Sequence, residues 1–287
     1  MTETPETDLN CTEYEVEEVK KINETDKQPV MFIHGLWLLP NSWDPWREVF
    51  ESKGYATTAP GWPDDPESTE EAHADPSVFA GKSISQIADH YEAVIGALDR
   101  KPAIVGHSFG GLLTEILAGR GLAAVSVPIS PAPFRGVLPL PYSALKSGSP
   151  VLRNPANRAR AVPLSFDQFK YGFANELDND EAEDLYERYS VAGSGKVLFQ
   201  AANANLNPWT EDKVDTSNPD RGPMLILAGE KDHTVPHAIA NASFKKERRN
   251  ESVTEIVEIE GRGHSLTIDH GWREVCDKAL EFVGRYV

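Results

Sequence analysis

Short apolar runs alternate along the chain with stretches whose apolar residues recur at helical spacing. The run Val30–Ile33 contains no polar residue, which is the pattern of a strand buried on both faces of a parallel sheet. Trp46, Val49 and Phe50 follow instead the spacing of one helix face. The alternation predicts an α/β protein. Strands are expected at 30–33, 55–59, 102–105, 123–129, 224–228 and 253–259, and helices at 42–53, 83–98, 112–118 and 270–286.

The segment before the first buried strand has a different pattern. From Thr12 to Lys21, Tyr14 and Val16 share one face of an imperfect alternation with charged residues. Period-two alternation is typical of a strand, and charged side chains suit the edge of a sheet. We therefore expect an exposed edge strand here.

The β/α order lapses in residues 133–218, which contain many prolines. Helical stretches occur there at Ser165–Phe173 and Asp178–Tyr189, and the apolar strand pattern resumes afterwards. A segment of this size would have only a marginal core by itself. We therefore predict one core domain formed by residues 1–132 and 219–287, with residues 133–218 inserted as a mostly helical lid.

Composition narrows the functional classes. The chain has 287 residues, 40% hydrophobic and 25% charged, with a formal net charge of −17. That charge disfavours binding to nucleic acid or to anionic membranes. No apolar run approaches the roughly 20 residues that span a bilayer, and the acidic start lacks the features of a secretion signal. We expect a soluble cytoplasmic protein, and the composition does not determine its oligomeric state.

One short motif has the composition of a reactive turn. Residues Gly106-His107-Ser108-Phe109-Gly110 follow a short apolar run and precede the helix-compatible run Leu112–Ala118. In such a strand–turn–helix the backbone reverses so tightly at the serine that only small flanking residues fit. The helix N-terminus adds unpaired N–H groups and a positive dipole end. The motif therefore indicates Ser108 as a nucleophile beside a site for a developing oxyanion.

With three further segments, this motif resembles the α/β-hydrolase family. Residues 30–35 are similar to the family's early strand and its His-Gly loop, residues 224–232 to its late strand with the acid, and residues 261–264 to its histidine loop. The four segments occur in the family's order. The resemblance implies an α/β-hydrolase fold, in which helices flank a mostly parallel central sheet and a helical lid is inserted.

The resemblance assigns the catalytic residues as Ser108, Asp232 and His264. A serine hydroxyl needs a base within hydrogen-bond reach, and the base needs a carboxylate that fixes its tautomer. Glu230 and Asp269 are the competing acids, Asp269 being also a candidate helix cap. The strand expected at 123–129, which follows the helix after Ser108, has no carboxylate at its end.

The family pattern places the oxyanion-hole donors at the backbone N–H groups of Leu36 and Phe109. An apolar substrate pocket is expected around these donors, and at Leu38 core packing remains an equal alternative. The residues expected to line it are Trp37, Leu38, Val235 and Leu266 from the core, and Phe169, Phe173 and Trp209 from the lid.

The other histidines have simpler interpretations. His34 is expected to be structural, and His107 to point away from Ser108. His233 and His237 have the i, i+4 spacing of a metal pair, but Pro236 disfavours a helix between them. His73, His90 and His270 are expected to be solvated or packing residues. We therefore expect no metal and no cofactor.

The predicted activity is that of a cofactor-independent serine hydrolase that cleaves small-molecule carboxylic esters with small to medium acyl chains through an acyl-enzyme. In the family that the chain resembles, the same triad also hydrolyses thioesters, amides and lactones, and it catalyses carbon–carbon cleavage and perhydrolysis. The type of bond that is cleaved therefore stays open. A non-catalytic ligand receptor on the same fold is the alternative of another class.

Overall fold

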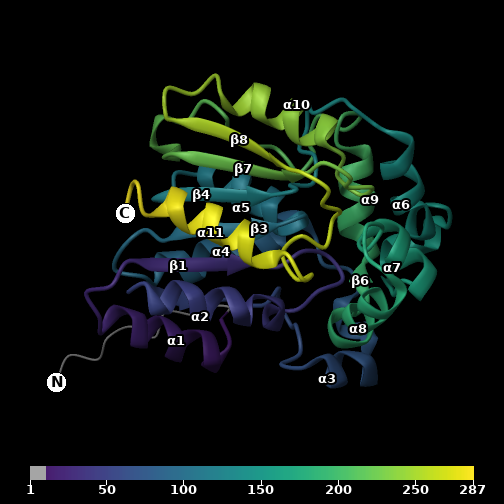
Figure 1. The fold of residues 1–287 in the computed structure, drawn as a ribbon, viewed down its shortest axis with the longest axis horizontal. Helices are drawn as coiled ribbons and strands as arrows, with labels where there is room; N and C mark the ends of the chain where they lie inside the picture. The colour runs from purple at the N-terminus through teal and green to yellow at the C-terminus, as the bar shows by residue number, and fades with distance from the viewer. Residues whose placement is uncertain (1–10) are drawn as a thin grey trace.

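Six parallel strands form the central sheet, in the order β2-β1-β3-β4-β7-β8. We describe residues 11–287 from a computed structural model (Figure 1). The acidic start at residues 1–6, where no secretion signal was predicted, lies outside them. In the centre of the sheet, Gly106 pairs with Ile33 on one side and Pro128 on the other. The strands are β1 Pro29–Ile33, β2 Ala56–Thr58, β3 Ala103–His107, β4 Val125–Ile129, β7 Met224–Gly229 and β8 Thr254–Ile259.

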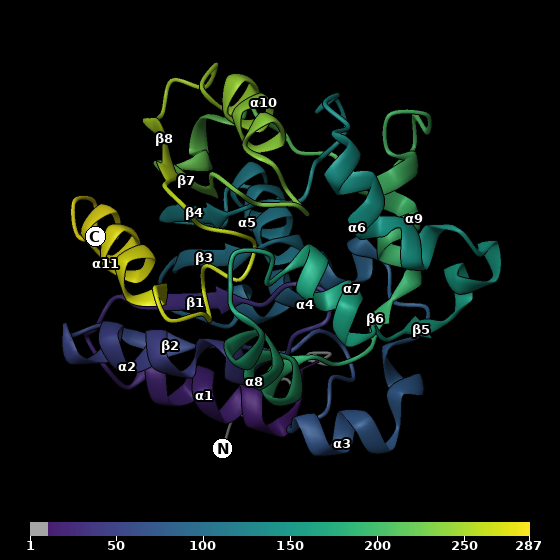
Figure 2. The same cartoon turned by 45° about the vertical axis from the view of Figure 1, so that its right-hand side comes forward.

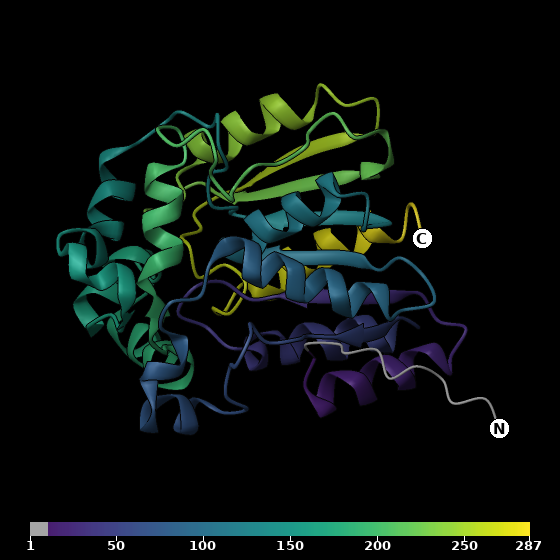
Figure 3. The same ribbon diagram turned by 180° about the vertical axis from the view of Figure 1, so that it is seen from behind.

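Helices cover both faces of this sheet, and the expected α/β architecture is confirmed. Side chains alternate along β1. Val30 and Phe32 pack in the cluster that includes residues of α2 (Asp44–Ser52) and α11 (Trp272–Val283). Met31 and Ile33 pack with residues of α1 (Glu13–Asn23), α4 (Ile84–Gly96), α5 (Phe109–Gly119) and α10 (His237–Glu247). Figure 1 shows α2 and α11 on the near face, and Figure 3 shows the opposite face. Strands β1, β3, β4 and β7 are therefore buried throughout, as the unbroken apolar run of β1 predicts for a strand covered on both faces.

Eleven α-helices and four short 3-10 helices lie within residues 11–287, and none is long and apolar enough to cross a membrane. The α-helices are α1 Glu13–Asn23, α2 Asp44–Ser52, α3 Thr69–Ala74, α4 Ile84–Gly96, α5 Phe109–Gly119, α6 Tyr142–Leu152, α7 Phe166–Gly172, α8 Asn179–Tyr189, α9 Gly195–Asn203, α10 His237–Glu247 and α11 Trp272–Val283. The 3-10 helices are Pro40–Trp43, Pro76–Phe79, Pro155–Ala159 and Pro219–Arg221.

The predicted edge strand at Thr12–Lys21 is wrong, because this segment forms helix α1. Thr12 and Glu15 make a reciprocal capping box at its start. The buried positions are 15, 18, 19 and 22, a helical period, whereas Tyr14 and Val16 are exposed. The apparent alternation was thus between two solvent-facing residues.

Two local predictions after β1 also differ from the structure. Ser42 does not cap α2: it lies in the preceding 3-10 helix and its hydroxyl donates to the Leu39 carbonyl at 2.6 Å. The region 60–76, predicted as a loop, contains α3, which Ser68 caps by accepting from the Glu71 N–H. At both places a serine hydroxyl bonds to a nearby backbone group. The helix start is therefore two residues later than predicted at Ser42, and a short helix replaces part of the predicted loop after Ser68.

Residues between β4 and β7 leave the sheet and form a separate group of helices. This group contains α6 to α9 and a two-stranded antiparallel ladder of β5 (Ala161–Val162) and β6 (Gly193–Ser194). Figures 1 and 2 show it at the end of the sheet toward which the strand arrows point. Helices α7 and α8 match the predicted stretches, whereas α6 and α9 were not predicted.

Candidate active site

Ser108 lies in the turn between β3 and α5, with φ 57° and ψ −115°. A positive φ at a residue with a side chain costs on the order of 1–3 kcal/mol, so the surrounding structure must impose it. The Ser108 N–H donates to the Ile129 carbonyl at 2.9 Å, and its carbonyl accepts from the Ala132 N–H at 2.9 Å. A Cβ on Gly110 would overlap the Ile33 carbonyl. The turn therefore requires glycine there and fixes the serine by its backbone.

A continuous chain of hydrogen bonds joins Ser108, His264 and Asp232. His264 Nε2 lies 2.9 Å from Ser108 Oγ, and His264 Nδ1 lies 2.7 Å from Asp232 Oδ2. Because a carboxylate only accepts, Nδ1 carries the proton and Nε2 is left to accept from the serine hydroxyl. All three residues are buried. This arrangement can take the proton from Ser108 as its oxygen attacks an electrophile.

The second oxygen of Asp232 is held by the backbone of its own loop. Asp232 Oδ1 accepts from the N–H groups of Thr234 at 2.8 Å and Val235 at 2.7 Å. Burial by itself raises the pKa of Asp232, but the His264 charge and hydrogen bond and the Val235 N–H outweigh it, so the pKa is lowered. The carboxylate is therefore ionised and oriented for His264.

Two further rings contact His264. His107 Nε2 donates to the His264 carbonyl at 2.9 Å, and burial, with the His264 charge, lowers the pKa of His107 to about 3. His107 is therefore neutral. The Phe173 ring packs edge-on against the His264 ring, with 4.8 Å between centroids. The backbone carbonyl of Phe173 accepts from the Ser265 N–H at 2.9 Å. The sequence carries no local signal for the His107 contact, because only packing brings the end of β3 beside the histidine loop.

The loop after β1 passes directly against the nucleophile. A Cβ on Gly35 would lie 3.0 Å from Ser108 Cβ, so the following residue, Leu36, is next to the turn that holds Ser108. Phe109 is the first residue of α5, and a helix's first N–H has no intrahelical acceptor. Trp37 continues the loop with a positive φ of 69°. The two N–H groups expected to form an oxyanion hole thus belong to residues that flank Ser108.

His34 is held by neighbours other than Ser108. Its Nδ1 lies 3.0 Å from the Gly35 carbonyl and its Nε2 lies 3.0 Å from Asp65 Oδ2. Its ring stacks on Trp62 with 5.3 Å between centroids. These contacts give the side chain a structural role in fixing the loop.

Most of the residues expected to line the pocket share one apolar cluster with Leu36 and Phe109. Trp37 is held within it from both sides: its Nε1 donates to the Val162 carbonyl at 2.9 Å, and its carbonyl accepts from the Val191 N–H at 3.0 Å. The Trp37 and Phe173 rings meet edge to face at 6.1 Å. The other expected residues in this cluster are Leu38, Phe169 and Val235.

The structure differs from the expectation at two pocket positions. Leu266 is fully buried in the cluster on the other face of the sheet, where the loop after β8 turns toward α11. Trp209 is 84% exposed, because the turn in which Asn207 accepts from its N–H faces solvent. Neither side chain lies in the apolar cluster of Leu36 and Phe109.

The space beside the loop that follows β1 is nearly filled. A cavity of about 10 Å³ is bordered by Leu36, Trp37 and Gly193 among others, and this volume holds about one water molecule. Ser108 itself is 4% exposed. Any molecule larger than water that is to reach Ser108 therefore requires some of the covering side chains to move.

His233 and His237 have separate partners. His233 Nδ1 lies 3.0 Å from the Tyr171 carbonyl, and His237 Nδ1 lies 3.3 Å from Glu258 Oε2.

The two competing acids also have other partners. The Glu230 carboxylate accepts from the Gly261 N–H at 2.9 Å, and Asp269 accepts from the Ser265 hydroxyl at 2.9 Å. The carboxylate that contacts His264 belongs to Asp232 and to neither of these acids.

Sequence comparison agrees with this architecture. Residues 30–278 match the model of the alpha/beta hydrolase family, and the chain belongs to that family. Comparison with curated protein sequences gives no match.

Solved structures of several hydrolases share the fold. The chain is similar to a monoacylglycerol lipase of Paleococcus ferrophilus (20% identity, 90% of this chain and 95% of that chain covered, TM-score 0.59). It is also similar to a thermophilic esterase of Thermogutta terrifontis (16%, 90% and 90%, TM-score 0.65) and a pyrethroid hydrolase of Sphingobium faniae (13%, 90% and 97%, TM-score 0.60). At these identities the likeness concerns the fold.

Proposed function

We propose that this chain is a cofactor-independent serine hydrolase that cleaves carboxylic esters with small to medium acyl groups. The observation that supports this is the buried hydrogen-bond chain from Ser108 Oγ through His264 to Asp232, at 2.9 and 2.7 Å. It combines a nucleophile, a base and an orienting acid. A lipase, an esterase and a pyrethroid hydrolase among the fold relatives agree with an ester substrate.

In the proposed reaction Ser108 Oγ attacks the acyl carbon while His264 Nε2 takes the hydroxyl proton. The N–H groups of Leu36 and Phe109 stabilise the tetrahedral oxyanion. His264 then protonates the leaving alcohol, and the acyl group stays on Ser108. Water, deprotonated by the same imidazole, attacks this acyl-enzyme. The bond between the acyl carbon and Ser108 Oγ then breaks, the acid leaves, and His264 Nε2 returns the proton to Ser108 Oγ. Asp232 stabilises the imidazolium throughout.

We further propose that residues 133–218 act as a lid on this site. Three contacts support the assignment: Phe173 on His264, the Val162 carbonyl on Trp37 Nε1, and the Val191 N–H on the Trp37 carbonyl. With so little free volume beside Leu36, substrate entry requires this segment to shift. Its apolar lining would reject charged acyl groups, whose desolvation it cannot compensate.

The decisive test is labelling with an organophosphonate, followed by turnover of an aryl acetate. We expect a single adduct on Ser108, and a loss of several orders of magnitude in kcat for Ser108→Ala. Ser126→Ala, which alters a buried serine on β4, is the matched control and should label and turn over normally. An adduct elsewhere, or normal turnover of Ser108→Ala, would overturn the proposal. Saturable binding without any turnover of esters, thioesters or amides would indicate the receptor alternative.

A further inference from the structure

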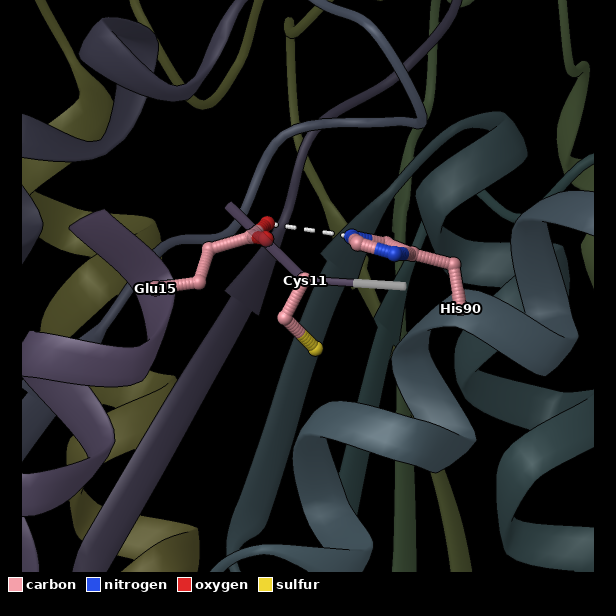
Figure 4. Close-up of side chains that lie close together, drawn as sticks. All are labelled: Cys11, Glu15 and His90. Carbon is pink, nitrogen blue, oxygen red and sulfur yellow. Dashed lines mark hydrogen bonds and ion pairs between the residues drawn. The ribbon is translucent and has the colours of Figure 1, made fainter. Parts of the chain in front are cut away.

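Three side chains that commonly bind metals converge where α1 begins beside α4. The ligand atoms of Cys11, Glu15 and His90 all lie within 4.8 Å of one another (Figure 4). Glu15 and His90 are buried, and Cys11 is half-buried. None of the three belongs to the Ser108 site. His90, expected from the sequence to be solvated or packing, is therefore part of a buried polar cluster.

The start of α1 fixes the carboxylate of this cluster. Thr12 Oγ accepts from the Glu15 N–H, and Glu15 Oε2 accepts from the Thr12 N–H at 2.7 Å. Glu15 Oε1 is thereby directed to His90 Nε2, which lies 3.0 Å away. Cys11 directly precedes this capping box and so lies next to the same carboxylate (Figure 4). Two ligands are held by helices, and the third is on the chain that leads into one of them.

The residue types suit a cation. A carboxylate, an imidazole and a thiol each offer a lone pair to a metal ion. The thiol gives up its proton when its sulfur binds the ion. A groove of about 990 Å³ that Asp64 and Asp89 also line borders the cluster and offers a path for entry.

We propose that Cys11, Glu15 and His90 form a binding site for a zinc-class divalent cation, with water as the fourth ligand. Thiolate, imidazole and carboxylate are the ligands that zinc takes. Bond lengths of about 2.0–2.3 Å in a tetrahedron separate the ligand atoms by about 3.3–3.6 Å. The 3.0 Å pair of Glu15 and His90 has to open by a few tenths of an ångström. Cys11 approaches by rotating its side chain.

Binding is a substitution with a defined proton balance. The cation replaces the hydrogen bond between His90 Nε2 and Glu15 Oε1, and it forms bonds to the Cys11 sulfur, the imidazole and the carboxylate. The thiol releases one proton, and an imidazolium at His90 would release a second. No electron is transferred. The bound ion would fasten the start of α1 to α4, two segments that lie far apart in the sequence.

The test is a titration of the metal-free full-length chain with Co²⁺, followed by competition with Zn²⁺. We expect one equivalent of Co²⁺ to give tetrahedral d–d bands and a thiolate-to-cobalt charge-transfer band, and Zn²⁺ to displace it. Mg²⁺ and Ca²⁺, which prefer all-oxygen sites, should not compete. At 100-fold excess over Kd, Zn²⁺ should raise Tm by about 5 °C.

The chain supplies its own control, because Cys276 is its other cysteine and is buried in α11. Cys11→Ser should abolish the charge-transfer band, and His90→Asn should weaken Co²⁺ binding at least tenfold. Cys276→Ser should leave both unchanged. Circular dichroism checks that each variant is folded. Absence of the band in the unmodified chain, its persistence in Cys11→Ser, or its loss in Cys276→Ser would overturn the proposal. The unmodified chain alone decides the question if a variant does not fold.

Discussion

The ring of Phe173 packs edge-on against the ring of His264, with 4.8 Å between their centroids. One residue follows helix α7 of the 133–218 segment, and the other lies in the loop that follows the last strand of the sheet. The contact therefore joins the proposed lid to the proposed catalytic base. Under the proposed function, the fit of an acyl group and the position of the base would depend on the same side chain.

Phe173→Ala should shift the preferred acyl length of aryl esters upward, because it opens space beside His264. It should also lower the free energy of unfolding by about 3–5 kcal/mol, as for other buried aromatic residues. The measurement is kcat/KM across esters of increasing acyl length, together with urea unfolding. Trp209→Ala is the matched control, since that ring is 84% exposed, and it should leave the profile unchanged. The lid hypothesis is wrong if the Phe173 variant keeps the original profile.

Asp232→Asn should preserve the fold and lower kcat by up to about 10⁴-fold, because an amide can favour the wrong imidazole tautomer. Glu230→Gln is the control: this neighbouring acid bonds to Lys231 and to the Gly261 N–H instead of His264. Its kcat should change little. Steady-state kinetics with one aryl ester checks both, and the opposite ranking would show that the acid is misassigned.

Gly110→Ala should lower the free energy of unfolding by about 3 kcal/mol or more, because its Cβ would overlap the Ile33 carbonyl. It should also reduce turnover, since the displaced α5 carries Ser108 away from His264. The control is Gly96→Ala at the exposed end of α4, where a Cβ meets nothing within 4 Å and stability should rise by up to about 1 kcal/mol. Urea unfolding measures both. Equal effects of the two substitutions would contradict this account of the turn.

A pH-dependent contribution to stability is expected from Glu115, which is fully buried in α5. Burial, and then the charge of Glu247, raises its pKa well above the usual value; the Ser243 hydroxyl donates to it. A carboxyl with a raised folded-state pKa contributes stability below its unfolded pKa, near 4.5. That contribution is lost as the pH rises toward the folded value.

Glu115→Gln removes this titration and keeps the acceptor for Ser243. The variant should therefore gain stability relative to the unmodified chain as the pH rises from about 5 to 8, by at least about 1 kcal/mol. Denaturant unfolding at several pH values measures the difference. A difference that stays constant with pH would show that Glu115 is ionised in the folded chain.

Local patterns determined the main elements of this protein. The apolar run at Val30–Ile33 predicts a doubly buried strand because burial on two faces excludes polar residues. Glycine at 110 is required by a turn whose backbone has no room for a Cβ. The order of four short segments indicated the family, which the comparison confirms. The same local logic failed at Thr12–Lys21, where two exposed residues imitated a strand and the buried face of a helix contained two glutamates.

The tertiary structure alone decided which distant side chains meet. Sequence order gives no distance between Ser108 and His264, 156 positions apart, nor does it bring His107 under the His264 carbonyl or Phe173 onto its ring. The sequence also suggested that Leu266 and Trp209 line the substrate pocket, because both are apolar residues in suitable segments. In the structure Leu266 packs on the other face of the sheet and Trp209 faces solvent. Hydrophobic periodicity reports that a residue is buried, and turn chemistry reports where the chain reverses. Which surfaces then face each other follows from how the helices pack against the sheet, and that packing also brings Cys11 and Glu15 to His90.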